Sequence, residues 1–418
     1  MIARTLLWQV TLALLSVTLY ASRCAAEDLS LSQTVEQALT NNPSIAADRL
    51  SADALRHAAR GARALINPEI SVAPGVIGKA GADSAIFFLQ ALEINGTRRV
   101  RGEIAVFEAN AAAFGAATTR RDVVLRVKQT YWDIGQAQEM VRLNEDNLRY
   151  LDALRVAVQK QYDVGAVPGS QVIKTDVEIA RARQELAQAQ LELAQRKASM
   201  NALLNRPVDR VFAVTDPLVF DDVNINREQF QATAQTHRPE FAAAQAQAEA
   251  ARKEVREARL RRLPDLAIQA RRETFESDSN SGVAVAVTLP LLDWGSVRAD
   301  VERAESAAQS RQKQLEAVKT GVALDIEQAF QVISTSSQIV REYQGGILVK
   351  SEELAKMART GYEKGATSYL EALESQRTLR STRAEYYSAL ADYAKALAKL
   401  EWATGYSLPN RANPEVKK

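Results

Sequence analysis

Two glutamates are the residues whose type and spacing most directly suggest chemistry in this sequence. Glu371 and Glu374 are three residues apart, so a helix would carry both carboxylates on one face. Carboxylates gathered in this way attract cations. The same spacing is also found in ordinary solvated charge pairs, because exposed carboxylates are the norm on protein surfaces. The two residues alone leave both interpretations open.

Catalytic patterns are not found in the sequence. It has no glycine-rich phosphate loop, no nucleophile elbow and no histidine or cysteine spacing typical of a metal site. A metal site built from the two histidines, His57 and His237, is conceivable, but isolated histidines are mostly surface or packing residues. We therefore expect no enzymatic activity, no cofactor and no resident metal ion.

Two tyrosine-glycine turns interrupt long, alanine-rich stretches that otherwise have the composition of helices. Their residues are Tyr162, Val164, Gly165 and Ala166 in the first turn, and Tyr362, Gly365 and Ala366 in the second. Glycine permits a positive φ, and small apolar neighbours leave a shallow surface on which another hairpin could dock. Turn geometry alone also explains the glycines.

After each turn an apolar seam recurs every seven residues. The seams are Val172, Ile179, Leu186, Leu193 and Met200 in the first stretch, and Ala372, Leu379, Tyr386, Tyr393 and Leu400 in the second. This period predicts helices packed in coiled-coil fashion, so the turns are predicted to be the tips of two antiparallel hairpins. The helix leading to each tip is roughly 65 residues long, or about 100 Å. The pair Gly345-Gly346 predicts a local break in the second of these two long helices.

The chain is predicted to be a duplication, because two proline pairs recur at a fixed shift. Pro43 and Pro68 in the first half match Pro239 and Pro264 in the second, and each pair encloses a helical stretch. The predicted divisions are a first repeat at 27–210 (strand pair 69–92, tip near 162–170), a linker at 211–226, a second repeat at 227–404 (strand pair 265–289, tip near 362–369) and a tail at 405–418.

Each repeat has a strand–turn–strand pattern after its second proline. In the second repeat Val283, Val285 and Val287 alternate with small residues, and the polar stretch Glu273–Ser281 is the expected turn. A small surface hairpin is one interpretation. Alternatively, these runs approach the ~9–11 residues that cross a bilayer as tilted barrel strands. Four strands cannot close a barrel, so several chains would then have to share it.

Residues 1–26 have the pattern of a signal peptide. Their apolar core, Leu6–Tyr20, is short for a membrane span, and cleavage is predicted after Ala26. A lipid anchor on Cys24 is the alternative, but Arg23 stands where lipid-anchor signals carry a small residue. Cleavage would remove the only cysteine and two arginines, leaving equal numbers of basic and acidic residues. Such a balance gives no excess of positive charge of the kind that binds nucleic acid.

The order of these features resembles the TolC family of outer-membrane channels, the exit ducts of Gram-negative efflux pumps and type I secretion systems. The resemblance covers almost the whole chain after residue 26 and includes the strand-to-helix turn Pro290–Gly295. It implies a mainly α fold with a small β part: duplicated long antiparallel helical hairpins plus two β-hairpins. Three chains would form a twelve-strand β-barrel in outer-membrane lipid, continuous with a twelve-helix tunnel in the periplasm.

The segment Gln90–Arg99 looks most like the heavy-metal branch of this family, typified by CzcC and CnrC. The usual Glu-Leu-Gly-Gly-Lys-Arg pattern of that branch differs here at Ile94, Asn95, Thr97 and Arg98. The resemblance implies export of divalent cations such as cobalt, zinc, cadmium or nickel, with a proton-driven inner-membrane RND pump and a periplasmic adaptor. Alternatives are a duct for drugs or type I secretion and, outside the family, a periplasmic adaptor or a structural coiled coil.

The resemblance also gives roles to the residues above. Counted from Gly365, Glu371 and Glu374 match the paired acids of the periplasmic constriction in TolC-like channels. Gln171 and Lys174 stand at the matching positions of the first tip, so an acidic ring would come from the second hairpin alone. The two turns are then the expected docking points for the adaptor. An exit duct needs no tight metal site, because conduction requires weak binding.

Overall fold

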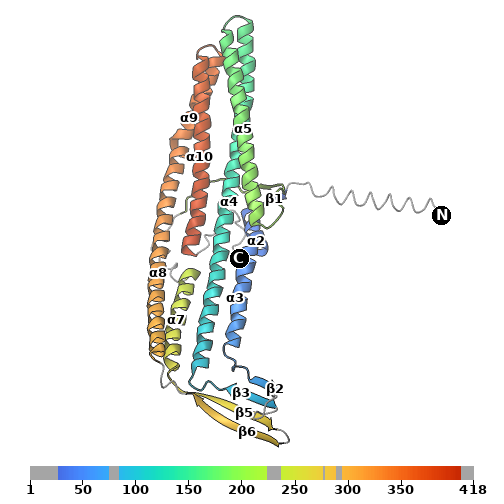
Figure 1. The fold of residues 1–418 in the computed structure, drawn as a ribbon. Coiled ribbons are helices and arrows are strands. Elements are labelled where there is room, and N and C mark those ends of the chain that lie inside the picture. The colour runs from blue at the N-terminus through green and yellow to red at the C-terminus, as the bar shows by residue number, and fades with distance from the viewer. Residues whose placement is uncertain (1–26, 75–83, 224–236, 276–277, 289–293, 406–418) are drawn as a thin grey trace, which may run out of the picture. The chain divides into compact units, whose positions relative to one another are not determined.

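The computed structural model describes residues 27–74, 84–223, 237–275, 278–288 and 294–405, and the chain is mainly helical (Figure 1). It forms two compact units, each built from segments of both halves of the sequence. The tip unit comprises Met1–Pro43, Arg121–Phe230 and Ile326–Lys418, and the sheet unit comprises Ser44–Arg120 and Gln231–Asp325. None of the helices in the described ranges is both long and apolar enough to cross a membrane.

The helices of the sheet unit begin where the sequence predicts. α3 spans Pro43–Gly61 and α7 spans Pro239–Leu260, each starting at a proline whose missing N–H costs nothing in the first turn. Two long helices, α4 (Thr97–Asp163) and α8 (Ser296–Glu342), also begin in this unit. Asn95 precedes α4, and its Oδ1 accepts a hydrogen bond from the first helical amide, that of Thr97, at 3.0 Å.

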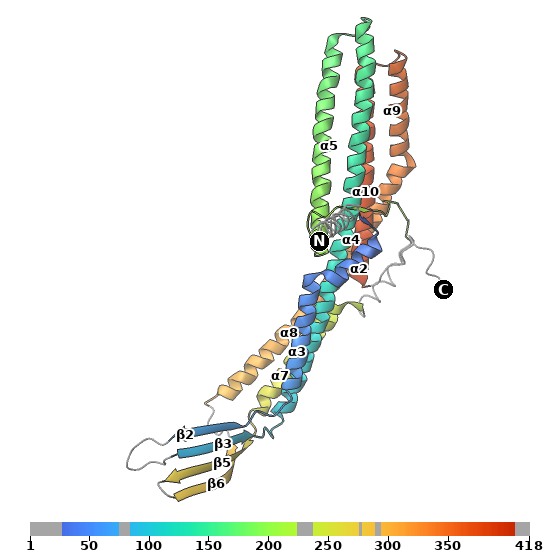
Figure 2. The same cartoon turned by 90° about the vertical axis from the view of Figure 1, so that its right-hand side faces the viewer.

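A four-stranded antiparallel sheet gives the sheet unit its name (Figure 2). Its strands are β2 (Glu69–Pro74), β3 (Ser84–Ala91), β5 (Asp265–Phe275) and β6 (Asp278–Thr288), in the order β2-β3-β5-β6. The central β3–β5 pair joins the two halves of the chain, so both predicted strand pairs lie in one sheet. β2 and β6 are left as its edges.

The predicted polar turn at Glu273–Ser281 is wrong in its extent. β5 continues to Phe275 and β6 begins at Asp278, and Arg272 lies directly opposite Ser281 in the ladder. The prediction failed because polar side chains were taken as the end of the strands. Backbone groups make the ladder, so a polar side chain on the outer part of a strand does not interrupt it.

The strand register divides the sheet into two faces of different character. Residues directly opposite each other in neighbouring strands share a face, and alternate residues along one strand change face. The apolar sheet face contains Ile70, Val72, Ile86, Phe88, Leu266, Ile268, Ala270, Val283, Val285 and Val287. The opposite sheet face contains Glu69, Ser71, Phe87, Leu89, Gln269, Arg271, Glu273 and Asn280. Val283 is 77% exposed and Ile70 is 68% exposed, so the apolar face is uncovered in the single chain.

A short parallel sheet in the tip unit was not predicted. β1 (Glu27–Leu29) pairs with β4 (Phe212–Val214), which lies in the predicted linker between the halves. Leu29 is 2% exposed and Phe212 is 1% exposed, so both side chains anchor this pair in the core. α2 (Leu31–Asn41) follows at once, and Ser30 forms a capping box with Gln33 at its start.

Two helical hairpins form the rest of the tip unit (Figure 1). The second part of α4 turns back into α5 (Gly169–Leu203), and α9 (Leu348–Glu363) turns back into α10 (Tyr369–Thr404). The π-helix η1 (Tyr343–Ile347) joins α8 to α9 and contains both glycines of the predicted local break. Seam positions are buried along both returning helices, namely Ile179, Met200, Ala372, Leu379, Tyr393 and Leu400.

Several predicted segments lie outside the described residues. They are the leader at residues 1–26 and nearly all of the tail at 405–418. The Pro290–Gly295 turn is described only from Trp294 onward. Each compact unit contains segments from both halves of the sequence. The units therefore do not correspond to the predicted repeats, and the repeat boundaries stay a prediction.

Candidate pore and docking site at the helical tips

The two tips have the same backbone turn. In the first tip the Gly165 amide donates to the Tyr162 carbonyl at 2.8 Å, and the Ala166 amide donates to the Gln161 carbonyl at 2.8 Å. The same two bonds close the second tip around Gly365, at 3.0 and 2.8 Å. Both glycines have φ of +74°. This is a Schellman motif, and the left-handed position explains why each turn contains glycine.

The tyrosines that precede these glycines have opposite environments. Tyr162 is 48% exposed, whereas Tyr362 is only 6% exposed. The Tyr362 hydroxyl donates to Oε1 of Gln161 at 3.1 Å, and its ring centroid lies 6.3 Å from that of Tyr369. Tyr369 in turn accepts a hydrogen bond from the Thr175 hydroxyl at 3.1 Å. The second tip is therefore anchored against the first hairpin by its aromatic side chains.

A hydrophobic cluster continues this anchor away from the tips. Its buried members are Leu151, Leu154, Val158, Ile179, Ala182, Tyr362, Tyr369, Ala372 and Leu373, drawn from α4, α5, α9 and α10. Burial raises the pKa of Tyr362 and of Tyr369, because the phenolate form is poorly solvated there. The two hairpins of one chain thus share a core immediately behind their tips.

The predicted pore glutamates both lie on the exposed surface of α10, close to the second tip. Glu371 is in the first turn of the helix, and its amide donates to the N-capping Ser368 hydroxyl at 3.2 Å. Glu371 makes no ion pair with any residue that the structure describes. Glu374 has an exposed side chain but lies 3.9 Å from a guanidinium nitrogen of Arg377. Of the two carboxylates, Glu371 has its charge less compensated.

Charged pairs between the hairpins were missed by the sequence analysis. Arg377 of α10 lies 2.7 Å from Glu178 of α5, and Arg380 of α10 pairs with Glu185 of α5. The hydrogen bond to Glu178 raises the pKa of the Arg377 guanidinium. Charged residues that flank a seven-residue seam often pair across it, so the seam could have indicated these positions.

The residues predicted to dock an adaptor are exposed at the tips, with one exception. Val164, Gly165 and Ala166 are exposed in the first tip, as are Gly365 and Ala366 in the second. Val164 is 78% exposed, and Leu370, which the sequence analysis did not single out, is 68% exposed. The exception is Tyr362, which is buried beneath the second tip.

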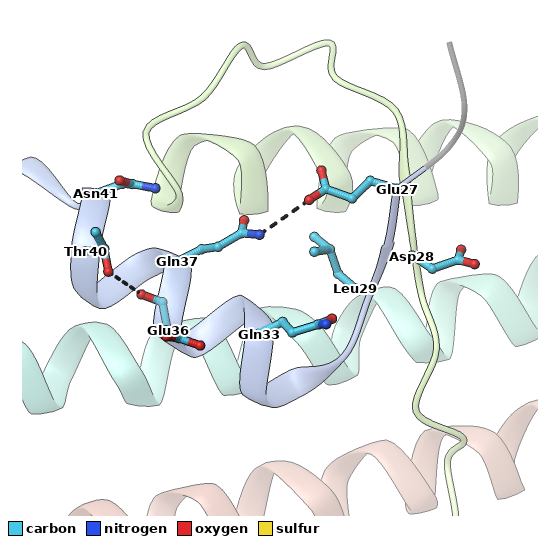
Figure 3. A pocket seen from close by; sticks show the side chains of 8 residues that line it. All are labelled: Glu27, Asp28, Leu29, Gln33, Glu36, Gln37, Thr40 and Asn41. Atoms are coloured by element: carbon cyan, nitrogen blue, oxygen red, sulfur yellow. Dashed lines mark hydrogen bonds between the residues drawn. The ribbon is translucent and has the colours of Figure 1, made fainter. Parts of the chain in front are cut away.

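A polar hollow of about 350 Å³ lies beside β1 and α2 in the tip unit (Figure 3). Glu27 at its edge accepts a hydrogen bond from Gln37 at 3.4 Å and lies 3.1 Å from Arg206 and 2.9 Å from Arg210. Both arginines form ion pairs with the Glu27 carboxylate, and these pairs help to hold β1 in place. Glu36 also lines the hollow.

No group of three or more His, Cys, Asp or Glu side chains able to hold a metal ion occurs among the described residues. His57 and His237 are both exposed, and His237 takes part in an interaction. Trp294 is 93% exposed with φ of +47°, two residues before the start of α8.

Comparison with known proteins gives matches over nearly the whole chain. The chain is 24% identical to the cobalt-zinc-cadmium resistance protein CzcC of Cupriavidus metallidurans, over 92% of this chain and 91% of that protein. It is 20% identical to the toxin and drug export protein A of Aggregatibacter actinomycetemcomitans, over 85% of this chain and 82% of that protein. Among solved structures, CusC superposes with a TM-score of 0.77 at 19% identity, covering 90% of this chain and 92% of that one.

The model of one family, described as outer membrane efflux protein, matches residues 34–206 and 232–406. Members of this family are transport channels of the Gram-negative outer membrane rather than enzymes, and they generally form homotrimers that work with adaptor and pump partners. The match spans both helical hairpins and the four-stranded sheet, and the expected resemblance to TolC-like channels is confirmed. The chain belongs to the outer membrane efflux protein family, and it is an efflux channel rather than an enzyme.

Proposed function

We propose that this channel is the exit duct of a tripartite, proton-driven efflux system that exports divalent heavy-metal cations. The observation that carries this proposal is the similarity to a cobalt-zinc-cadmium resistance protein over nine-tenths of both chains. The exposed carboxylates of Glu371 and Glu374 favour cations in the duct. The similarity to a toxin and drug export protein, over somewhat less of both chains, supports drug or toxin export as the second candidate.

The functional unit in this proposal is a trimer. A sheet with an exposed apolar face and two unpaired edges is unstable in lipid unless its edges are paired, so β2 and β6 would pair with β6 and β2 of neighbouring chains. Three four-stranded sheets then form a twelve-strand barrel. Exposed apolar residues on one side of α5, namely Ile173, Val177 and Leu191, support a matching helix contact between chains.

Several finer assignments belong to this proposal. Residues 1–26 are a signal peptide, residues 27–210 and 227–404 are structural repeats, and residues 211–226 link them. The exposed residues of both tips dock a periplasmic adaptor, and the adaptor connects the duct to an inner-membrane RND pump. Glu371 and Glu374 line the narrow periplasmic end of the pore. The shared Schellman turn and the exposure of Val164 and Leu370 support a role of the tips in docking.

The test is deletion of the gene and complementation in the native host. Under the proposal, loss of the channel raises sensitivity to cobalt, zinc or cadmium, and the wild-type gene restores resistance. The same strains exposed to a panel of drugs and assayed for secreted proteins provide the second arm. Unchanged metal tolerance together with new drug sensitivity would favour the second candidate. The purified protein should be a trimer in detergent by light scattering, and a soluble folded monomer would rule out the channel assembly.

A further inference from the structure

One charged residue interrupts the apolar sheet face. Arg272 of β5 lies opposite Ile86 of β3 and Ser281 of β6, and the register gives all three residues the same face. Its neighbours along β5, Arg271 and Glu273, lie on the other face and are 3.9 Å apart as an ion pair. Arg272 is exposed and makes no hydrogen bond or ion pair with any residue that the structure describes.

Arg272 also borders a hollow in this face. The hollow measures about 390 Å³, and apolar side chains make most of its wall on the apolar face, with Ser281 beside the arginine. The hollow is lined by Ile86, Phe88, Ala270, Arg272, Ser281 and Val283 of this face, and also by Arg271 and Gly282, which the register assigns to the opposite face. An apolar wall with one cation at its edge is complementary to an amphiphile with an acyl chain and an anionic headgroup.

The position of Arg272 along the strand fits a headgroup. It is three residues before Phe275, where β5 turns into β6, whereas α7 enters the sheet at the opposite end of β5, near Asp265. Under the proposed function the helices are periplasmic, so the strand turns face outward. Arg272 then lies on the outer part of the lipid-facing surface, where a charged side chain is less costly than at the midplane of the bilayer.

We propose that Arg272 and the surrounding hollow bind an anionic lipid through its headgroup phosphate. Arginine suits this ligand because its planar guanidinium donates two parallel hydrogen bonds to phosphate oxygens. In a zwitterionic lipid the headgroup cation offsets the phosphate charge that the guanidinium would match, and a soluble anion would leave the apolar wall uncovered. The inference rests on the proposed membrane location of the sheet, and it adds one lipid site per protomer.

The neighbouring residue Arg271 provides a matched control. Arg271 is also an exposed arginine on β5, but its side chain lies on the opposite face and pairs with Glu273. The variants Arg272→Gln and Arg271→Gln therefore remove the same charge at adjacent positions and on different faces. Both positions are exposed, so neither substitution should prevent folding.

The experiment is native mass spectrometry of the detergent-purified protein titrated with phosphatidylglycerol, with phosphatidylcholine of the same acyl chains as the zwitterionic probe. We expect saturable binding of phosphatidylglycerol, weakened about tenfold in Arg272→Gln, as for loss of one of the two charge-assisted hydrogen bonds when the glutamine amide keeps the other. Arg271→Gln should bind like wild type. If the wild type is a trimer but binds phosphatidylglycerol no more tightly than Arg272→Gln does, or no more tightly than it binds phosphatidylcholine, the inference alone is overturned. A wild type that is soluble and monomeric overturns the proposed function as well.

Discussion

The first and second tips close with the same Schellman turn around Gly165 and Gly365, yet the tyrosine side chains next to these turns are packed differently. In the second tip Tyr362 is buried and contacts the first hairpin, whereas Tyr162 of the first tip points to the surface. The second tip also carries the two exposed glutamates, and the first has Gln171 and Lys174 at the matching positions. The same turn geometry thus occurs in two different tips. The second is anchored by Tyr362 and carries Glu371 and Glu374, whereas the first has neither the buried tyrosine nor this pair of glutamates.

The largest expected difference between the tips comes from their tyrosines. Tyr362→Ala should lower the free energy of unfolding by about 3 kcal/mol, because it removes a buried aromatic side chain from the shared cluster. Tyr162→Ala should cost less than about 1 kcal/mol, since its ring is half exposed. Thermal unfolding and hydrogen exchange near each tip measure the two effects. Equal losses in the two variants would contradict the asymmetry.

The glycines should behave alike in the two tips. Gly165→Val and Gly365→Val each place a β-branched residue at φ of +74°, at a cost on the order of 1–2 kcal/mol of local strain. A Cβ at either position meets no atom within 4 Å, so the core should stay intact. Under the proposed docking role, both variants assemble as trimers but fail to restore efflux in the deletion strain. Full efflux by both variants would remove the tips from the docking surface.

The glutamates provide an electrical comparison of the tips. Glu371→Gln/Glu374→Gln should abolish cation preference with little change in thermal stability, because both side chains are exposed. Of the two single variants, Glu371→Gln should reduce the cation preference more than Glu374→Gln, since Arg377 already lies near Glu374. The measurement is the reversal potential across a planar bilayer in a salt gradient. An identical reversal potential in wild type and the double variant would make these residues ordinary surface charges.

The smallest expected effect is a response to alkaline pH at the second tip. Burial raises the pKa of Tyr362 and Tyr369, so folding favours their neutral forms. Their contribution to stability is full below about pH 10, the ordinary tyrosine pKa, and declines as the pH rises further toward the raised values. Hydrogen exchange between pH 9 and 11 should show residues around Tyr362 losing protection before residues around Tyr162. Simultaneous loss at both tips would argue against this order.

Local patterns predicted much of this structure. The tip turns follow from single glycines, and the helical hairpins follow from the seams, of which the structure buries members such as Ile179 and Met200. Each signal lies within a few turns of one helix, where periodicity and residue type decide the outcome. The prolines at positions 43 and 239 likewise start their helices as expected.

Features that depend on distant partners could not be predicted in this way. β1 has three residues, too few to show alternation, and its partner β4 is far along the chain. Tyr162 and Tyr362 occupy the same local motif, so only the packing of the second tip against α4 and α5 distinguishes them. The ion pairs of Arg377 and Arg380 also connect different helices: the seam indicates that these positions flank it, but not which residue of α5 each arginine pairs with.

The β3–β5 pairing has a consequence for how the protein folds. Ser84 lies opposite Thr274, so the centre of the sheet must wait until the second half of the chain has been made. Closing so long a loop is slow, whereas the helical hairpins need only local contacts. Until then β3 presents an open edge next to exposed Ile86, a combination that favours aggregation. The first half expressed alone should therefore form its helices but depend on a chaperone to remain unaggregated.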